Sequence, residues 1–142
     1  MSTKSILIVD DDSDDRELFR DAVLEVDSSV ECIACRNGEE MLLLLSQKDP
    51  FIPSYIFLDM NMPLLNGRQC FKELREREQF REIPVIIYTT SKLSKDMQEM
   101  IKEENVYFMT KPYRFDDLRK SIANVLAEDW EKMNGTVNAP SR

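Results

Sequence analysis

The stretch Ser54-Tyr-Ile-Phe-Leu-Asp-Met-Asn-Met-Pro63, residues 54–63, decides the fold of this chain. Its first half, Tyr55 to Leu58, is a short apolar run with aromatic members, which is typical of a strand buried on both faces. The run stops at Asp59, and Pro63 then prevents further regular strand pairing. An acid at the end of a buried strand is expected at the rim of a sheet, where open α/β sheets carry their ligands and chemistry.

Similar apolar runs lie on either side of this strand, separated by segments with the 3.6-residue periodicity of amphipathic helices. The predicted strands are residues 5–9, 30–35, 55–58, 85–88 and 106–109. Helices are expected after Ser13 or Asp14, either of which could cap the first of them, and over 39–47, 68–77, a stretch beginning near Ser94, and 114–130. The charged residues 76–82 are expected to form a solvated connection. Regular alternation predicts parallel strands joined by right-handed crossovers, hence a three-layer doubly wound α/β sheet.

The length of 142 residues and the hydrophobic fraction of 42% indicate one globular domain. We expect it to span residues 4–132, with a flexible tail over 133–142 after the turn signal Asn134-Gly135. No apolar stretch approaches the roughly 20 residues that cross a bilayer, and the N-terminus lacks the features of a signal peptide. These observations predict a cytoplasmic protein that is not inserted in a membrane.

Charge and composition exclude several functions. Lysine and arginine total 19 against 27 acids, a formal net charge of −8, which opposes general binding to nucleic acid. The sequence has no histidine, which excludes a histidine-based triad, a histidine–zinc site and a phosphohistidine carrier.

The three cysteines suit reduced thiols in a reducing compartment. Cys32 and Cys35 match a C-x-x-C pattern, but they fall on a predicted strand, where positions three apart face opposite sides. Redox motifs instead use a helix N-terminus to lower the thiol pKa, so a redox function is not expected.

Polar residues follow four of the predicted strands. Asp10 and Asp11 end the first, Asp59 ends the third, Thr89 ends the fourth, and Lys111 follows the fifth. Because the carboxyl ends of parallel strands share one edge, these residues are expected to converge there.

Three carboxylates in one place repel each other unless a cation joins them, and Mg²⁺ suits such oxygen ligands. Lys111 could neutralise a phosphoryl oxygen, and Thr89 could donate a hydrogen bond to another. Positioned positive charge around an in-line nucleophile is what phosphoryl transfer requires. Asp59 is the natural nucleophile, since a carboxylate can form a covalent acyl phosphate.

These residues lie in motifs that resemble the receiver domain of two-component response regulators. The matching segments, in order and at the family's spacing, are Ile8-Val9-Asp10-Asp11, Leu58-Asp59-Met60-Asn61-Met62-Pro63 with Asn66-Gly67, Tyr88-Thr89-Thr90-Ser91 and Thr110-Lys111-Pro112. The resemblance implies a flavodoxin-like sandwich with strand order 2-1-3-4-5. It also implies a signalling domain rather than an enzyme, which at most catalyses its own phosphorylation and slow dephosphorylation.

The resemblance implies a role for each site residue. Asp59 is then the phosphoacceptor. Asp11, Asp59 and the backbone carbonyl of Asn61 are the expected direct Mg²⁺ ligands, with Asp10 acting on the metal through water.

Thr89 and Lys111 are the pair that senses the phosphoryl group, and Phe108 falls at the aromatic switch position. Movement of Thr89 towards the phosphoryl group would vacate space for Phe108 and change the surface of the fourth helix, fifth strand and fifth helix.

The implied phosphodonor is a sensor histidine kinase or a histidine phosphotransfer protein. Because the sequence shows no DNA-binding or catalytic domain, output is expected through a downstream protein or a homodimer. The Thr-Thr-Ser run, the charged segment before Pro84 and Trp130 are also similar to stand-alone receivers that serve bacterial phytochrome-type kinases, although Trp130 is more often the anchor of a terminal helix.

Two alternatives share parts of this pattern. A magnesium-dependent aspartyl phosphohydrolase needs a general acid two residues after the nucleophile, and here that position is Asn61. A receiver fold used only as a binding module usually lacks part of the acid set, which is complete here. A calcium loop starting at Asp10 fails because its sixth and twelfth positions are Asp15 and Asp21, rather than glycine and glutamate.

Overall fold

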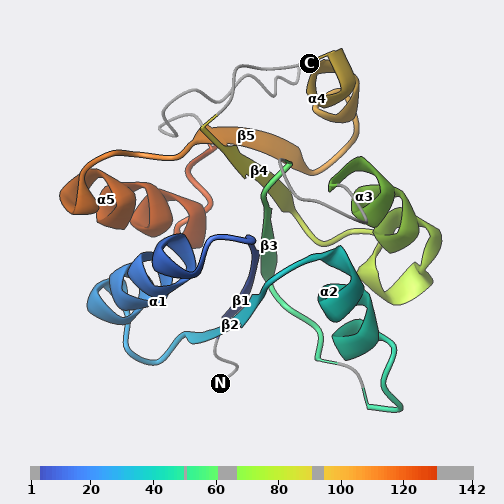
Figure 1. The fold of residues 1–142 in the computed structure, drawn as a ribbon, viewed down its shortest axis with the longest axis horizontal. Coiled ribbons are helices and arrows are strands. Elements are labelled where there is room, and N and C mark those ends of the chain that lie inside the picture. Colours follow the sequence, from blue (N-terminus) through green and yellow to red (C-terminus); the bar gives the residue numbers. More distant parts are fainter. Residues whose placement is uncertain (1–3, 50, 61–66, 91–94, 131–142) are drawn as a thin grey trace.

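The computed structural model describes residues 4–49, 51–60, 67–90 and 95–130. Its centre is one parallel sheet with strand order β2-β1-β3-β4-β5, which confirms the predicted fold class and order. The strands are β1 (Ser5–Val9), β2 (Glu31–Cys35), β3 (Tyr55–Leu58), β4 (Val85–Thr89) and β5 (Val106–Thr110). Figure 1 shows β3 in the middle of the molecule, with helices on either side of the sheet.

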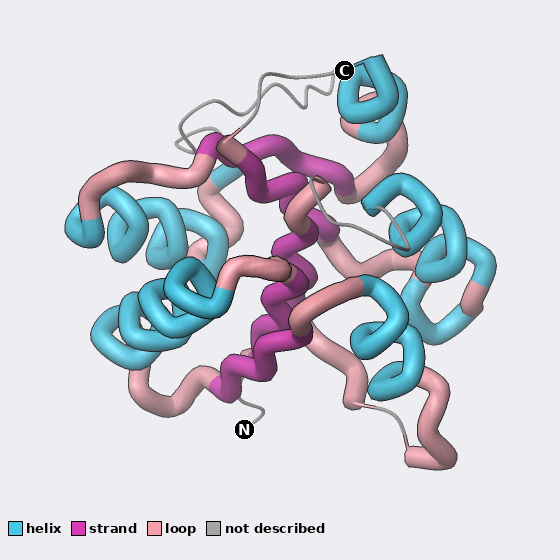
Figure 2. Tube along the Cα trace, in the orientation of Figure 1, coloured by secondary structure: helices cyan, strands magenta, loops and turns pink. Residues whose placement is uncertain are grey.

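Helices form the two outer layers. They are α1 (Ser13–Val26), α2 (Gly38–Leu45), α3 (Gly67–Glu76), α4 (Lys95–Met100) and α5 (Phe115–Leu126), with a short 3-10 helix η1 (Glu78–Phe80). Helices α1 and α5 cover one face of the sheet, and α2, α3 and α4 cover the other (Figures 1 and 2). Each crossover therefore brings the chain back to the same edge of the sheet.

Alternating strand residues separate the core into two halves. Ile6 and Ile8 pack on the α1–α5 side, while Leu7 and Val9 pack on the other side. Every residue of β1, β3 and β4 is buried, which explains why these strands are continuous apolar runs.

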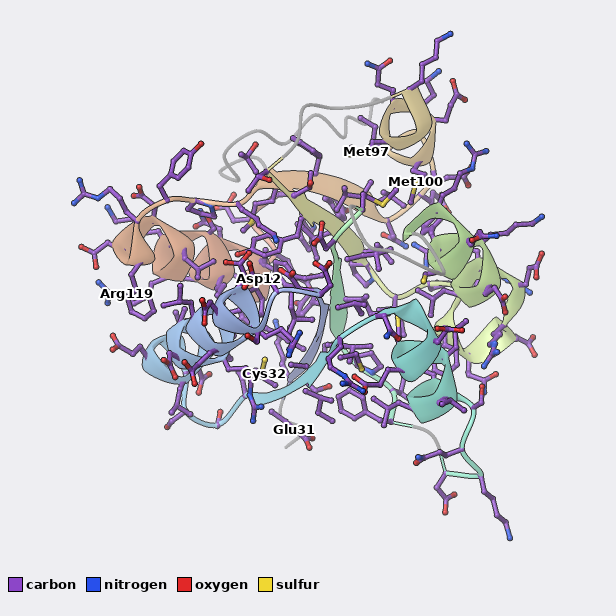
Figure 3. The ribbon with its side chains drawn as sticks, viewed as in Figure 1. Asp12, Glu31, Cys32, Met97, Met100 and Arg119 are labelled. Atoms are coloured by element: carbon purple, nitrogen blue, oxygen red, sulfur yellow. The ribbon has the colours of Figure 1, made fainter. Side chains whose placement is uncertain are left out.

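The two cysteines of β2 lie in different halves of the core, as their spacing predicts. Cys32 packs on the α1 side of β2, as Figure 3 shows, whereas Cys35 belongs to the opposite half. Both thiols are free, and burial raises the pKa of each to about 12. Protonated, separated thiols are inert, which agrees with the absence of a redox role in the sequence interpretation.

The cap of the first helix lies earlier in the sequence than predicted, and α1 already begins at Ser13. Asp12 is the N-cap, and its Oδ1 accepts hydrogen bonds from the backbone N–H groups of Asp14 and Asp15 at 2.9 and 3.1 Å. The expectation that Ser13 or Asp14 caps the helix was therefore wrong, because both already lie in the first turn.

Two other boundaries differ from the sequence interpretation. The charged segment before Pro84 contains η1, whose Phe80 is fully buried, so it is more than a solvated connection. The last helix ends at Leu126 rather than Trp130, because Glu128 adopts a positive φ of 57° that an α-helix cannot continue through.

Several predictions fall outside the described residues: the cap at Ser94, the turns at Asn66 and Asn134, and the tail over 133–142. Within the described ranges, no helix has both the length and the apolar character needed to cross a membrane.

Candidate functional site

The site is built on hydrogen bonds that extend the sheet one residue beyond its strands. The backbone N–H of Asp10 donates to the last carbonyl of β2, and that of Asp59 donates to the last carbonyl of β1, both at 3.0 Å. The N–H of Lys111 donates to the carbonyl of Thr89 at 2.9 Å. These ladder bonds fix the backbones of three site residues at the carboxyl edge, as the topology predicts.

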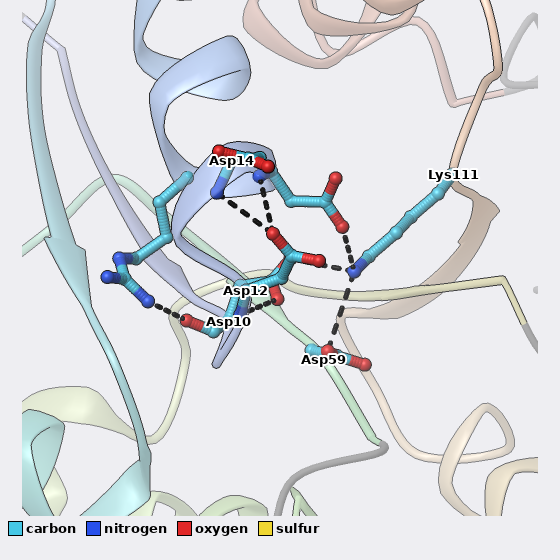
Figure 4. Close-up of polar contacts among 7 residues, drawn as sticks. Asp10, Asp12, Asp14, Asp59 and Lys111 are labelled. Carbon is cyan, nitrogen blue, oxygen red and sulfur yellow. Dashed lines mark hydrogen bonds and ion pairs between the residues drawn. The ribbon is translucent and has the colours of Figure 1, made fainter.

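The Lys111 ammonium lies at the centre of the site. Its Nζ is 2.7 Å from Asp10 Oδ2, 3.0 Å from Asp15 Oδ2 and 3.5 Å from Asp59 Oδ2. Figure 4 shows the lysine side chain reaching from the end of β5 towards Asp59 and the acids that follow β1. One positive charge is thus shared among three carboxylates.

Two opposing effects act on the charge of Lys111. Burial alone would lower the pKa of this amine, but its hydrogen bonds with Asp10 and Asp15 outweigh burial and raise the pKa above its usual range. The Nζ atom also lies 5.4 Å from the centre of the Tyr88 ring, a cation–π distance. Lys111 is therefore held as a cation.

Asp10 is the most deeply buried acid of the site, with no exposed surface. Burial raises its pKa to about 6, although Lys111 and the backbone N–H of Asp12 both favour the ionised form. That N–H donates to Asp10 Oδ1 at 3.0 Å, and the Arg16 guanidinium donates to the Asp10 carbonyl at 2.8 Å. The Asp12 N–H and the Lys111 ammonium thus orient the carboxylate, while Arg16 holds the backbone, and the carboxylate remains costly to ionise.

Asp10, Asp11 and Asp59 each offer a carboxylate oxygen to one small volume, with all three atoms within 4.8 Å of one another. Two of these acids are buried and Asp11 is exposed, so the group is open to solvent on one side. Hard oxygen donors in this arrangement fit a divalent cation such as Mg²⁺. Asn61, the predicted carbonyl ligand, lies outside the described residues.

The predicted switch residues are on the two strands beyond β3. Thr89 is the last residue of β4 and is fully buried. Phe108 lies opposite Ile87 in the β4–β5 ladder and packs in the core half that includes Met97 and Met100 of α4. The structure thus places Thr89 at the site edge and Phe108 in the same core half as the buried methionines of α4.

Sequence reasoning missed Asp15, which contacts Lys111 directly. The residue had been interpreted as one of several acids favoured by the positive end of a helix dipole. The signal that could have found it is its position three residues after the true cap, Asp12. Tyr88, whose ring faces the lysine, was assigned to its strand and to a family motif, but no role at the site was predicted for it.

A family model described as "Response regulator receiver domain" matches residues 6–123. The chain therefore belongs to the receiver domain family of two-component response regulators. It is 27% identical over 126 residues to response regulator Rcp1 of Synechocystis, and the match covers 86% of each chain. The same region of sequence that forms the sheet and the site carries the match.

Solved structures agree with this assignment. The Mn²⁺-bound form of response regulator Rcp1 is 26% identical, with a TM-score of 0.72 and coverage of 97% of this chain and 99% of that one. The bacteriophytochrome response regulator RtBRR is 28% identical, with a TM-score of 0.71 and coverage of 99% and 85%. Receiver domains bind a divalent metal at an acidic pocket, and the cluster of Asp10, Asp11 and Asp59 could hold such an ion.

Proposed function

We propose that Asp59 accepts a phosphoryl group from a phosphohistidine of a partner protein. The observation that carries this proposal is a carboxylate only 4% exposed at the end of the central strand, 3.5 Å from a lysine ammonium. In the transfer, an Asp59 oxygen bonds to phosphorus while the phosphorus–nitrogen bond breaks and the imidazole leaves. The product is an acyl phosphate on Asp59.

Positive charge around the transferred group lowers the barrier, because phosphoryl transfer is accelerated mainly by positioning and electrostatics. Lys111 supplies one charge to a phosphoryl oxygen, and the Thr89 hydroxyl supplies a hydrogen bond. Mg²⁺ held by Asp10, Asp11 and Asp59, with the Asn61 carbonyl, would neutralise further phosphoryl charge. As a signalling domain, the chain would at most catalyse its own phosphorylation and a slow dephosphorylation.

The new dianion on Asp59 attracts Thr89 and Lys111 and so changes the packing of Phe108. Phe108 belongs to the same core half as the buried residues of α4. A change in its packing would therefore reach α4 and β5, and we take the surface of α4, β5 and the neighbouring α5 as the output face. A downstream protein or a second copy of the chain would read this face. Phosphate-dependent dimerisation is checked by size-exclusion chromatography with and without a phosphodonor.

The donor is a sensor histidine kinase or a histidine phosphotransfer protein, and the likeness to RtBRR favours a phytochrome-type kinase. The free thiols of all three cysteines fit a reducing compartment, so we place this exchange in the cytoplasm. Residues 4–132 form the phosphoaccepting domain. A phosphotransfer screen against purified kinases, phytochrome-type kinases among them, identifies the donor.

The assignment of Asp59 is tested by incubating the chain with phosphoramidate and Mg²⁺. We expect one phosphoryl group by intact mass, removed by hydroxylamine as an acyl phosphate should be. The Asp59→Asn variant should remain unmodified, since its amide is not a nucleophile. The Asp14→Asn variant loses the same charge from an exposed position nearby and should be modified like the wild type.

Persistent hydroxylamine-sensitive modification of Asp59→Asn would refute the assignment. Equal modification without Mg²⁺, in the presence of a chelator, would refute the role given to the metal.

A further inference from the structure

Asp15 gives the site an anion that none of the strand ends supplies. Its Oδ2 lies 3.0 Å from Lys111 Nζ, nearer than the 3.5 Å between that amine and Asp59. The contact joins the first turn of α1 to the residue after β5, 96 positions apart in sequence.

The local backbone holds Asp15 in this position. Its N–H is bonded to the cap residue Asp12, which fixes the first turn of α1 against the end of β1. Asp14 shares that cap but is exposed, and in the described part of the chain it forms no ion pair with Lys111. Two neighbouring acids therefore have the same charge and the same turn, but only one reaches the amine.

An ammonium has three N–H donors, and here three carboxylates already surround it. A phosphoryl group arriving at Asp59 adds more acceptors, so Lys111 must weaken an existing contact to bind it. The contact with Asp10 is fully buried, whereas the Asp15 side chain is 35% exposed and recovers water when released. The Asp15 contact is the one most easily given up.

We propose that Asp15 is a positioning residue that competes with the phosphoryl group for Lys111 and thereby limits the rate of phosphorylation of Asp59. This inference rests on the proposed phosphoacceptor function. Asp15 acts through the lysine and does not touch the reacting atoms. Its carboxylate keeps the amine turned partly away from Asp59 until a phosphoryl group offers a stronger partner.

The test measures the second-order rate constant for phosphorylation by phosphoramidate in saturating Mg²⁺. We expect Asp15→Asn to raise this constant about two- to fivefold, the range that corresponds to losing a partly exposed ion pair. Asp14→Asn, which removes an equal charge next to it, should leave the constant near the wild-type value. Asp15→Glu restores the anion and should bring the constant back towards the wild type.

A double-mutant cycle separates positioning from general charge effects. In a Lys111→Met background, which will itself be slow, Asp15→Asn should make no further difference. Thermal unfolding followed by circular dichroism verifies that each variant is folded at the assay temperature.

An unchanged or lower rate constant in Asp15→Asn would overturn the proposal, as would an equal rise in Asp14→Asn. The three single variants decide this even if Lys111→Met does not fold. Failure of the wild type itself to accept a phosphoryl group would instead refute the proposed function, and this inference with it.

Discussion

The two ends of the sheet each use a lysine, in opposite ways. At the carboxyl end, the Lys111 ammonium is shared by three carboxylates, and Asp11 adds further negative charge nearby. At the amino end, Lys4 donates to the Tyr55 hydroxyl at 3.1 Å and to the backbone carbonyl of Leu126, the last residue of α5. The Tyr55 hydroxyl in turn donates to Glu128 at 2.7 Å.

The amino end is thus balanced, with one cation and one carboxylate linked through a hydroxyl. The carboxyl end has more carboxylates than cations. Their mutual repulsion destabilises the fold unless Lys111 or another cation neutralises it. This difference indicates that the amino end contributes to holding the chain together, while the carboxyl end gives up stability for the cation binding and phosphoryl acceptance proposed above.

The largest expected effect comes from removing the cation of the carboxyl end. We expect Lys111→Met to lower the free energy of unfolding by about 3 kcal/mol in metal-free buffer, because the buried Asp10 carboxylate loses its ion pair. Saturating Mg²⁺ should reduce this difference, since the metal replaces the lost charge and binds only the folded chain. Urea denaturation followed by circular dichroism, with and without Mg²⁺, measures both values.

The matched control is Lys120→Met, an exposed lysine of α5, which should change the free energy of unfolding by less than about 0.5 kcal/mol. If Lys111→Met unfolded at the same urea concentration as the wild type, the carboxyl end would not depend on its lysine.

The second effect has the opposite sign. We expect Asp10→Asn to stabilise the metal-free chain at pH 7 by about 1 kcal/mol, because it removes a buried charge from an end with too many acids. Burial raises the pKa of Asp10 to about 6, above its unfolded value, so ionised Asp10 destabilises the fold above that pH. The gain should shrink as the pH falls below about 6, where the wild-type carboxyl also becomes neutral.

Urea denaturation at several pH values gives this profile, and a magnesium titration of the same variant should show weaker binding. Asp14→Asn serves again as the control of equal charge. Destabilisation of Asp10→Asn at pH 7 would show that the ion pair with Lys111 outweighs the cost of burying the acid.

The smallest effect belongs to the amino end. Tyr55→Phe keeps the buried ring but removes the hydroxyl between Lys4 and Glu128. We expect a loss of about 0.5 kcal/mol, because both charged partners are exposed and recover water. The rate of phosphorylation by phosphoramidate should not change, and a changed rate would show that the two ends of the sheet are coupled.

The comparison also explains which parts of the molecule could be predicted from sequence. Apolar runs and helical spacing predict the alternation of strands and helices, and parallel strands must then bring Asp10, Asp11 and Asp59 to the edge that Lys111 also reaches. The convergence of these four residues follows from topology, without knowledge of any side-chain conformation. This is why the carboxyl end was largely predictable.

The features that the sequence did not predict depend on the backbone conformation at single residues. Predicting the contact of Asp15 with Lys111 would have required knowing which residue caps α1. Without that knowledge, any of several adjacent acids could have been the one that reaches the lysine. The end of α5 was misplaced because Trp130 continues the apolar periodicity, although Glu128 has already turned the chain. Trp130 is instead held by packing, with its ring stacked on Tyr107 at a centroid distance of 4.0 Å.

That stacked indole has a practical consequence for spectroscopy. Trp130 is the single tryptophan of the sequence, and it lies beside Tyr107 and Tyr55 near the amino ends of β5 and β3. Its fluorescence emission therefore reports on the junction between the sheet and the segment after α5. Quenching or a spectral shift on addition of metal or phosphodonor would be a signal carried through the full length of the sheet.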